Sequence, residues 1–542
     1  MEQRVPSPPV SGRGTPWYRR RRVLVGGGVA LVLAGALSVA AVVADGGTNK
    51  KSADPGKPTA QASAPLKAPT APPVKVCGNT KALSGTATAP AGAVVVGLTD
   101  NLQDLTSHHP AGTTFWLMPG RHRLSNGAFV QVIPKQGNQY LGAPGAILDG
   151  ANRNKYAFTG YATDVVIRNL TIQNFGKAKG NNDEGVVNHD SATGWVIEGN
   201  TVQHNAGAGV MIGTRNVLKG NCLRDNGQYG FNAYNPGRVA SITIQGNEIT
   251  GNNTDDWENL RPGCGCTGGG KFWSVAGAVV RANYIHENNG PGMWADTNNS
   301  AFAVEGNYIA DNVAEGMIFE TSYNAAIRAN TFLRNGLRKG PDNEGFPAPA
   351  LYLSESGADK RVPGMYNQTF EVSGNVFTDN WSGVILWENA DRFAGSAANT
   401  STGSGTLVNP SVVTTTTCNA STIRTQPYLG DCRWKTQNVR VHDNVFNLNP
   451  AVLGARCASR SGCGYNGIFS NWGTFPEWSP YKARTVEDAI TFHQGNRFFS
   501  NTYSGPWKFM VHEQGNSVNW AAWQGAPYGQ DEDSVVKVLG ER

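Results

Sequence analysis

The sequence predicts an all-β solenoid, a single large domain whose repeating coils of about 23 residues stack on one another. Asparagine recurs at regular spacing, Gly is abundant at 67 residues, and charged residues make up only 16% of the chain. Such low charge argues against long charged helices and against a highly charged disordered chain. Because each coil buries its apolar side against its neighbours, a chain of 542 residues needs no second core.

The repeat unit is an Asn, a short apolar stretch, a second Asn, and a Gly followed by another short apolar run. The first Asn of the units is at Asn200, Asn221, Asn247, Asn283, Asn307, Asn330, Asn375 and Asn444. The second Asn is at Asn205, Asn226, Asn252, Asn288, Asn312, Asn335 and Asn380. The spacings from Asn200 to Asn375 are 21, 26, 36, 24, 23 and 45, so the coil has 21–26 residues and two coils carry insertions.

An Asn at the same corner of every coil can hydrogen-bond along the solenoid axis and satisfy backbone groups that a tight corner leaves open. Asn and Gly also tolerate the left-handed backbone of such corners. Between the corners, alternating Val, Ile and Phe indicate short strands. A leucine-rich repeat would show Leu at fixed positions and a propeller would need longer blades, so the pattern predicts a parallel β-helix.

Three segments resemble the pectate-lyase-like superfamily of right-handed parallel β-helices. The stretch 112–120 is similar to its entry strand, and 145–150 and 169–172 are similar to its first coils. The resemblance spans residues 85–515 and implies a right-handed parallel β-helix with a small capping helix at 101–106. Residues 253–256 are similar to part of the polygalacturonase signature. The other motifs of that family are missing, so no catalytic set is carried over.

The amino-terminal 76 residues carry a net charge of +8, so the remainder carries −2. A nearly neutral body argues against nucleic-acid binding. Arg19 to Arg22 precede an apolar run, which predicts an export signal or an uncleaved transmembrane anchor over residues 1–44. Both hypotheses place the body outside the cytoplasm, and only this segment would contact the membrane. Residues 45–74, rich in Pro, Ala, Ser and Lys, predict a disordered linker.

Eight cysteines in an exported chain predict disulfides. Cys418 with Cys432 and Cys457 with Cys463 are close in sequence. Cys264 and Cys266 are too close for an easy bridge to one another, so we expect each to pair elsewhere, with Cys77 and Cys222 as candidates. The β-helix is predicted over 75–515, and the aromatic-rich carboxyl terminus, including 516–542, is predicted to cap its open end.

The side chains after each coil's Gly predict one outward face, because side chains alternate along a strand. This phase points Trp294 and Asp296 outward after Gly292, Glu320 after Gly316, and Lys271 and Trp273 after Gly269. Tyr234 and His189 are expected to flank this exposed patch. The insertions 251–270, 336–362 and 390–437 are expected to wall it.

Two neighbouring carboxylates, Asp296 and Glu320, are what glycoside hydrolysis needs, and exposed Trp faces are sugar platforms. The sequence therefore predicts an extracellular carbohydrate-active enzyme that cleaves polysaccharide, either a glycoside hydrolase or a polysaccharide lyase. In a lyase, Lys271 or Tyr234 would abstract the proton next to a uronate carboxylate. The alternative from another class is a non-catalytic protein that binds glycans at the cell surface.

A calcium ion is a candidate cofactor for the lyase hypothesis. Asp255, Asp256 and Glu258, with Asp296, would supply its oxygen ligands. The alternative interpretation of these residues is a solvated acidic loop.

Overall fold

The computed structural model describes residues 66–537, apart from 344–345, 363, 365–368, 399–408, 410, 460–461, 472 and 474. The predicted export signal or anchor at 1–44 and the linker residues 45–65 lie outside these ranges. Among the described residues, no helix is long and apolar enough to cross a membrane.

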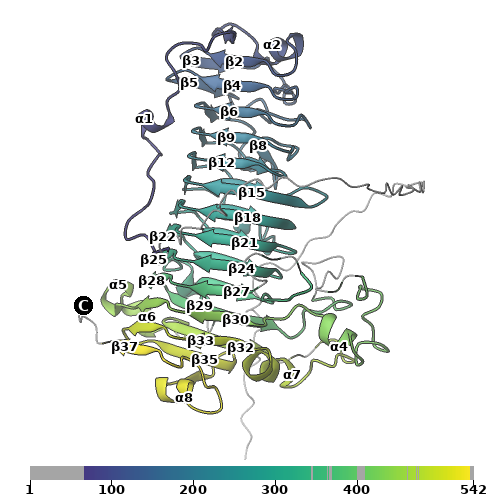
Figure 1. Cartoon of the computed structure of the whole chain (residues 1–542), viewed down its shortest axis with the longest axis vertical. Coiled ribbons are helices and arrows are strands. Elements are labelled where there is room, and N and C mark those ends of the chain that lie inside the picture. Colours follow the sequence, from purple (N-terminus) through teal and green to yellow (C-terminus); the bar gives the residue numbers. More distant parts are fainter. Residues whose placement is uncertain are drawn as a thin grey trace, which may run out of the picture. The chain divides into compact units, whose positions relative to one another are not determined.

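The described strands form three sheets, and the chain visits them in turn as it winds along one axis (Figure 1). Sheet 1 contains β1 (Val94–Val96), β2 (Thr114–Leu117), β4 (Gln139–Gly142), β6 (Val166–Arg168), β9 (Val196–Glu198), β12 (Val217–Lys219), β15 (Val239–Gln245), β18 (Val275–Arg281), β21 (Ser300–Glu305), β24 (Tyr323–Arg328), β27 (Phe370–Ser373), β30 (Val439–His442) and β33 (Arg497–Phe499). Sheet 2 contains β3 (Gly120–Arg123), β5 (Ala146–Asp149), β7 (Thr171–Gln173), β10 (Thr201–Gln203), β13 (Cys222–Arg224), β16 (Glu248–Thr250), β19 (Tyr284–His286), β22 (Tyr308–Ala310), β25 (Thr331–Leu333), β28 (Val376–Thr378), β31 (Val445–Asn447), β34 (Thr502–Ser504) and β37 (Val535–Lys537).

Sheet 3 contains β8 (Gly185–Val187), β11 (Ala208–Ile212), β14 (Phe231–Ala233), β17 (Gly270–Phe272), β20 (Met293–Ala295), β23 (Met317–Glu320), β26 (Pro349–Ser354), β29 (Ser382–Asn389), β32 (Tyr465–Asn471), β35 (Lys508–Glu513) and β36 (Ser517–Val518). Neighbouring strands pair in parallel, except that β36 is antiparallel to β35. The predicted parallel β-helix is confirmed. The short helices are α1 (Thr80–Leu83), α2 (Leu102–His108), α3 (Trp257–Leu260), η1 (Gly340–Asp342), α4 (Tyr428–Asp431), α5 (Pro450–Leu453), α6 (Ala455–Ser459), α7 (Thr485–Asp488), η2 (Ala489–His493) and α8 (Trp520–Gln524).

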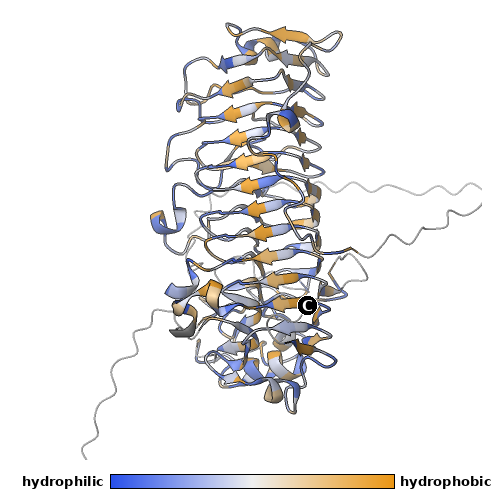
Figure 2. Ribbon diagram, turned by 90° about the vertical axis from the view of Figure 1, so that its left-hand side faces the viewer, coloured by the Kyte–Doolittle hydropathy of each residue, from blue (hydrophilic) through white to orange (hydrophobic). Residues whose placement is uncertain are grey.

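The core lies inside the coils, and the hydrophobic residues of the strands follow one another from coil to coil (Figure 2). Phe332, Phe377, Phe446 and Tyr503 occupy the same place in successive coils of sheet 2. Their ring centroids are 4.9, 4.9 and 4.8 Å apart, and the rings are stacked. Each coil therefore buries its aromatic ring only by contact with the next, as expected of a solenoid.

The two predicted rows of Asn form continuous hydrogen-bonded ladders. Asn307 Nδ2 donates to Asn330 Oδ1 at 2.9 Å and to the Val280 carbonyl at 2.9 Å, and its backbone N–H donates to the same Oδ1. The ladders explain how so many polar side chains can be buried, because the hydrogen bonds compensate the lost hydration of the amides. The first ladder also continues past the predicted Asn444 to Asn501 and ends on buried Asp531.

Both ends of the described β-helix are covered. Helix α2 begins after Asn101, whose side chain accepts a hydrogen bond from the Gln103 N–H, so the expected capping helix is confirmed. At the other end Trp523 of α8 is fully buried and stacks on Phe509 with centroids 4.8 Å apart. Strand β37 adds to sheet 2 beyond β34.

The disulfides correct one expectation. Cys418–Cys432 and Cys457–Cys463 form as predicted, but Cys264 is bonded to Cys266, and Cys77 to Cys222. The expectation that Cys264 and Cys266 pair elsewhere was wrong. Cys222 lies on the outer face of sheet 2, and the amino-terminal segment that crosses this face places Cys77 beside it. Cys264 and Cys266 therefore bond to one another.

The strap, residues 66–84, lies along the outer face of sheet 2 (Figure 1). The backbone N–H groups of Val76 and Cys77 donate to Glu248 Oε2 at 2.6 and 2.8 Å. Thr331 Oγ1 donates to the Pro69 carbonyl at 2.6 Å. Residues 66–74 of the predicted linker are therefore part of this strap.

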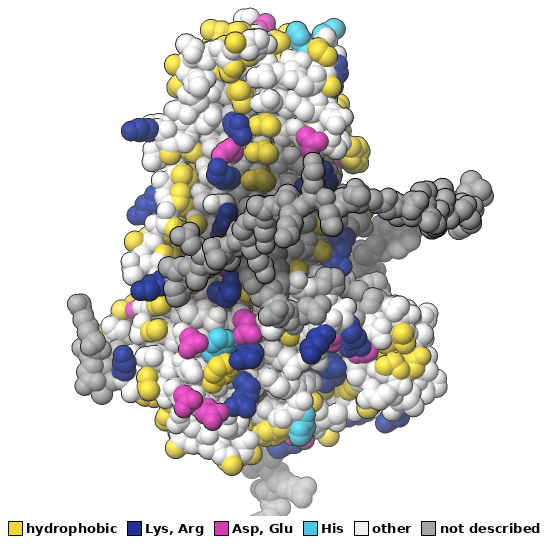
Figure 3. All heavy atoms as spheres, viewed as in Figure 1, with side chains coloured by type: hydrophobic (Ala, Val, Ile, Leu, Met, Phe, Trp, Pro, Cys, Tyr) yellow, Lys and Arg dark blue, Asp and Glu magenta, His cyan; other side chains and the backbone are white. Residues whose placement is uncertain are grey.

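The outer face of sheet 1 carries side chains of both charges (Figure 3). Arg168, Glu198 and Lys219 occupy the same position in successive strands. The Glu198 carboxylate is 2.9 Å from Arg168 Nε and 2.8 Å from Lys219 Nζ. Such exposed ion pairs contribute little to stability. The ion pairs on the outer face of sheet 3, by contrast, are buried.

Candidate active site

The outward side chains of sheet 3 follow the predicted phase. Lys271, Trp294 and Ile318 are aligned across β17, β20 and β23, and Phe272, Ala295 and Phe319 are aligned beside them. The second set lies in the coil core, and the first set does not. Asp296 and Glu320 each follow the aligned pair Ala295 and Phe319, so they come next to one another on the outer side.

The predicted patch is not exposed, which corrects the sequence-based expectation. Trp294 and Glu320 are each 1% exposed, and Lys271 and Asp296 are each 5% exposed. Trp273 is half-buried, and Tyr234 is 39% exposed. The outward phase was right, but chain segments outside the strands cover the face.

Gly265 and Arg392 belong to the segments that cover this face. Gly265 packs so closely on the Trp294 ring that a Cβ at this position would lie 2.6 Å from Trp294 Cη2. Arg392, which follows β29, lies over Glu320 with its side chain 2% exposed. Both residues belong to segments that the sequence predicted as walls, and these segments close over the face.

The Lys271 ammonium is bound on three sides. Its Nζ lies 2.9 Å from Asp296 Oδ2 and 3.9 Å from the centre of the Trp294 ring, and it donates to the Gly265 carbonyl. Asp296 Oδ1 also accepts hydrogen bonds from the N–H and the hydroxyl of Thr297, at 2.8 and 3.0 Å. Both carboxylate oxygens of Asp296 therefore have partners within the protein.

The Glu320 carboxyl group lies at the centre of the buried cluster. Trp294 Nε1 donates to its Oε2 at 3.2 Å, and Arg392 Nη1 donates to its Oε1 at 2.5 Å. Burial raises the pKa of Glu320 to about 7, Arg392 opposes the rise, and the negative charges of Asp296 and Glu355 add to it. Near neutral pH this carboxyl group therefore exchanges a proton.

The structure adds residues that the sequence analysis missed. Arg392 also binds Glu355 Oε2 at 2.6 Å, and Arg433 is ion-paired with Glu388. Four buried carboxyl groups therefore face three cations in this region: Asp296, Glu320, Glu355 and Glu388 against Lys271, Arg392 and Arg433. The cluster has one more acidic group than basic groups.

An aromatic group extends this face along the axis. Tyr352 is aligned with Ile318, and Trp387 is aligned with Phe469 on the following strand. Tyr352 and Trp387 stack with centroids 6.2 Å apart, and Phe346 contacts both rings edge-on. The alternation of side chains after each coil's Gly, counted from Gly383, would have predicted that Trp387 points outward. No such pattern indicates Phe346, Arg392 or Arg433, because these residues lie outside the strands.

Comparison with known families agrees with this architecture. A family model described as "Right handed beta helix region" matches residues 148–270 and 185–358. The chain is a right-handed parallel β-helix.

No curated protein matches the sequence of this β-helix. The catalytic unit of a thermostable GH87 α-1,3-glucanase from Streptomyces thermodiastaticus strain HF3-3 is 13% identical, with a TM-score of 0.47, covering 85% of this chain and 72% of that one. The A-module of the mannuronan C-5 epimerase AlgE6 from Azotobacter vinelandii is 15% identical, with a TM-score of 0.33, covering 58% of this chain and 86% of that one. Similarities this low do not bear on the activity.

The remaining predicted residues lie apart from the cluster around Glu320. His189 stacks on Tyr156 with centroids 3.8 Å apart, and Tyr156 donates to Glu184 Oε2 at 2.7 Å. Tyr234 follows β14, the strand before Lys271, and its carbonyl accepts a hydrogen bond from Ser191.

The three candidate calcium ligands have separate partners. Asp255 accepts from the Lys179 N–H at 2.7 Å, Asp256 from Asn259 at 2.5 Å, and Glu258 from the Gly263 N–H at 2.5 Å. Over the part of the chain that the structure describes, no three His, Cys, Asp or Glu residues are placed to hold a metal ion. Asp296 is bound to Lys271 instead.

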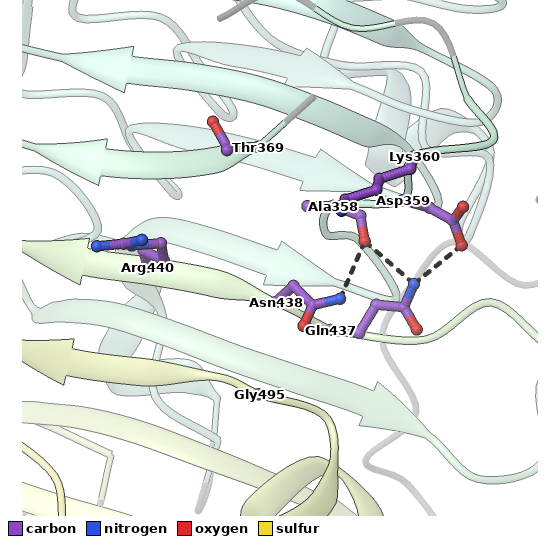
Figure 4. A pocket seen from close by; sticks show the side chains of 8 residues that line it. All are labelled: Ala358, Asp359, Lys360, Thr369, Gln437, Asn438, Arg440 and Gly495. Carbon is purple, nitrogen blue, oxygen red and sulfur yellow. Dashed lines mark hydrogen bonds between the residues drawn. The ribbon is translucent and has the colours of Figure 1, made fainter. Parts of the chain in front are cut away.

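A hollow with a volume of about 470 Å³ lies on the outer side of sheet 1 (Figure 4). Its floor is held by Gln437 and Asn438, which both donate to the Ala358 carbonyl, at 3.1 and 3.3 Å. Lys360 reaches over it, and Asp359 is bound by Arg361. This hollow is lined by one carboxylate, so it lacks the pair of acidic groups that glycoside hydrolysis needs.

Proposed function

We propose that this β-helix is an extracellular enzyme that hydrolyses a polysaccharide at the outer face of sheet 3. The observation that carries the proposal is the buried Glu320 carboxyl group, whose pKa of about 7 suits a general acid. Asp296 lies beside it, with its Oδ2 2.9 Å from Lys271 Nζ. Glycoside hydrolysis uses such a pair of carboxyl groups, one as the general acid and the other as the base or nucleophile.

In the proposed reaction, Glu320 gives its proton to the leaving glycosidic oxygen as the bond to the sugar carbon breaks. In the same step, Asp296 takes a proton from the water that attacks the sugar carbon or itself attacks that carbon as the nucleophile. Trp294 and Trp387 supply flat apolar faces for sugar rings. Trp387 Nε1, buried and without a hydrogen-bond partner among the described residues, would donate to a sugar hydroxyl.

The charge of the cluster favours an uncharged polysaccharide over a uronate polymer. Its acidic groups outnumber its basic groups, and Lys271 and Arg392 are already bound to carboxylates. A lyase would need a free cation to neutralise the uronate and a free base near it. Lys271 cannot serve as either while it is paired with Asp296, so hydrolysis is the better proposal.

The proposed location outside the cytoplasm rests on the four disulfides and on the predicted signal or anchor at residues 1–44. Cysteines in a reducing compartment would not keep these bonds. The membrane, on this proposal, is contacted only by that amino-terminal segment.

A non-catalytic protein that binds glycans at the cell surface is the second candidate. The burial of Asp296 and Glu320 favours it, because both carboxyl groups are fully engaged within the protein. Hydrolysis requires that the segments bearing Gly265 and Arg392 admit a sugar chain, whereas binding elsewhere on the surface does not.

The test is product release from a panel of neutral and uronate-containing polysaccharides. New reducing ends report cleavage, and ultraviolet absorbance of unsaturated ends reports elimination alone. We expect reducing ends without absorbance, and their loss in Glu320→Gln and Asp296→Asn. Glu198→Gln is the matched control, because Glu198 is also an ion-paired carboxylate but lies on sheet 1. Glycan binding without release from any substrate would favour the second candidate.

A further inference from the structure

The segment that covers Trp294 is closed by a disulfide between residues separated by a single glycine. Cys264 and Cys266 are bonded with Gly265 between them. Gly265 has a φ of +61°, it packs on the Trp294 ring, and its carbonyl accepts a hydrogen bond from Lys271. The bridge therefore fixes the backbone at the point where the segment touches the candidate active site.

The two sulfurs have different surroundings. Cys266 is 1% exposed and packs in a small cluster with Tyr229 and Trp257, whereas Cys264 is only partly buried. A thiol from solvent therefore meets the Cys264 side of the bridge first, and exchange depends on such access.

A carboxyl group adjoins the more exposed sulfur. Glu258 Oε2 lies 3.8 Å from Cys264 Sγ, while its Oε1 accepts from the Gly263 N–H at 2.5 Å. Burial raises the pKa of Glu258 to about 7, opposed by hydrogen bonds from Gly263 and Gly265 and by the charges of Lys271 and Lys339. A proton donor is thus placed beside a sulfur that must leave as a thiol.

We propose that the Cys264–Cys266 bridge is a thiol–disulfide exchange site for a dithiol, and that its reduction releases Gly265 from Trp294. The exchange itself is independent of the proposed hydrolysis. Only the consequence for the active site, that sugar gains access to Trp294, rests on the proposed function.

The exchange balances with a dithiol as the reductant. One thiolate of the dithiol attacks Cys264 Sγ, forms a mixed disulfide and expels the Cys266 thiolate, which takes up a proton. The second thiolate of the dithiol then attacks its own sulfur in the mixed disulfide and expels Cys264. Glu258 gives its proton to the departing Cys264 sulfur. The protein gains two thiols, and the dithiol becomes a cyclic disulfide.

Reduction frees the backbone of Gly265, since glycine has the largest conformational freedom to regain. To keep the contact with Trp294 and the hydrogen bond from Lys271, the loop would then have to lose the conformational entropy that it gained on reduction. This entropy cost weakens both contacts. Loosening of residues 257–273 is the expected structural result.

The experiment treats the intact protein with dithiothreitol, traps free thiols by alkylation, and identifies them by mass spectrometry. We expect Cys264 and Cys266 to be alkylated on the order of tenfold faster than Cys418 and Cys432, since both of the latter sulfurs are buried. Hydrogen exchange of the same samples should show loss of protection in residues 257–273. Reduction of all bridges together, or unchanged protection after selective reduction, would overturn the proposal.

Three variants sharpen the result. Cys264→Ser with Cys266→Ser should show the loosened exchange pattern without any dithiol. Cys457→Ser with Cys463→Ser, which removes another short bridge, should leave the dithiol response of 257–273 unchanged. Glu258→Gln should slow alkylation of Cys264, and an unchanged rate would remove Glu258 from the exchange step. Loosening without a gain in polysaccharide cleavage would contradict the proposed function and leave the exchange site standing.

Discussion

The interior corners of the β-helix and the outer face of sheet 3 both bury polar side chains, but they do so in different ways. At the corners, each Asn is satisfied by the Asn of the next coil and by backbone carbonyls, as for Asn307 with Asn330. On sheet 3, Glu320 is satisfied by Trp294 and by Arg392, which is 72 residues away in the sequence. Neutral ladders repeat with the coil, whereas buried charges depend on segments that the repeat does not specify.

This difference predicts how much stability a substitution removes in each region. A ladder member shares its hydrogen bonds with two identical neighbours, so its removal costs a few neutral hydrogen bonds. A member of the charge cluster leaves an uncompensated charge when its partner is removed, which costs more. Substitutions can test this order.

The largest effect is expected from Arg392→Met. Arg392 binds both Glu320 and Glu355, and all three side chains are at most 2% exposed. Removal of the shared cation leaves two buried carboxyl groups without their partner, which should lower the free energy of unfolding by roughly 3–5 kcal/mol at pH 8. Urea unfolding measures it, with Arg168→Met on sheet 1 as the control, since an exposed pair contributes about 0–1 kcal/mol. Equal effects in the two variants would contradict the distinction between the regions.

The next effect concerns pH. The pKa of Glu320 is about 7 in the folded protein and 4.5 in an ordinary glutamate. Between these values the folded state binds more protons than the unfolded state, so the contribution of Glu320 is fully present below pH 4.5 and is lost as pH rises to about 7. The loss amounts to on the order of 3 kcal/mol.

Glu320→Gln removes this titration. We therefore expect the variant to gain stability relative to the natural protein as pH rises from 4.5 to 7. The measurement is the difference in unfolding free energy between the two proteins at a series of pH values. The contributions of other titrating groups, such as Glu258 with its pKa of about 7, are the same in both proteins and cancel in this difference. A difference that does not change with pH would mean that Glu320 titrates normally.

The smallest of the three effects is expected in the ladder. Asn444 Oδ1 accepts from the N–H and the side-chain amide of Asn375, and its own amide donates to Val372 and Asn501. Asn444→Ala leaves these groups without partners and should cost roughly 2–3 kcal/mol. Asn447→Ala, three residues along the same coil but on the outer face of β31, should change stability by less than about 0.5 kcal/mol. A larger cost than that of Arg392→Met would reverse the comparison.

The fold and part of the candidate site could be predicted because they repeat. The Asn positions, the strands between them and the outward phase of Lys271, Trp294 and Glu320 all follow from contacts between one coil and the next. A nearest-neighbour pattern of this kind is written into short stretches of sequence. The same rule would have added Trp387, had it been applied at Gly383.

What only the tertiary structure decided lies in the segments between strands. The way in which the insertions fold back over sheet 3 decides three features of the site. It buries Glu320, it places Arg392 and Glu355 around Glu320, and it bonds Cys264 to Cys266. Arg392 is 72 residues from Glu320 and 37 from Glu355. Like the Cys264–Cys266 bridge, these contacts lie in segments between the strands, so no periodic pattern indicates them. The sequence by itself determined the coil and the direction of its side chains, and the loops decided their environment, because burial and charge pairing depend on three-dimensional neighbours rather than on position within a repeat.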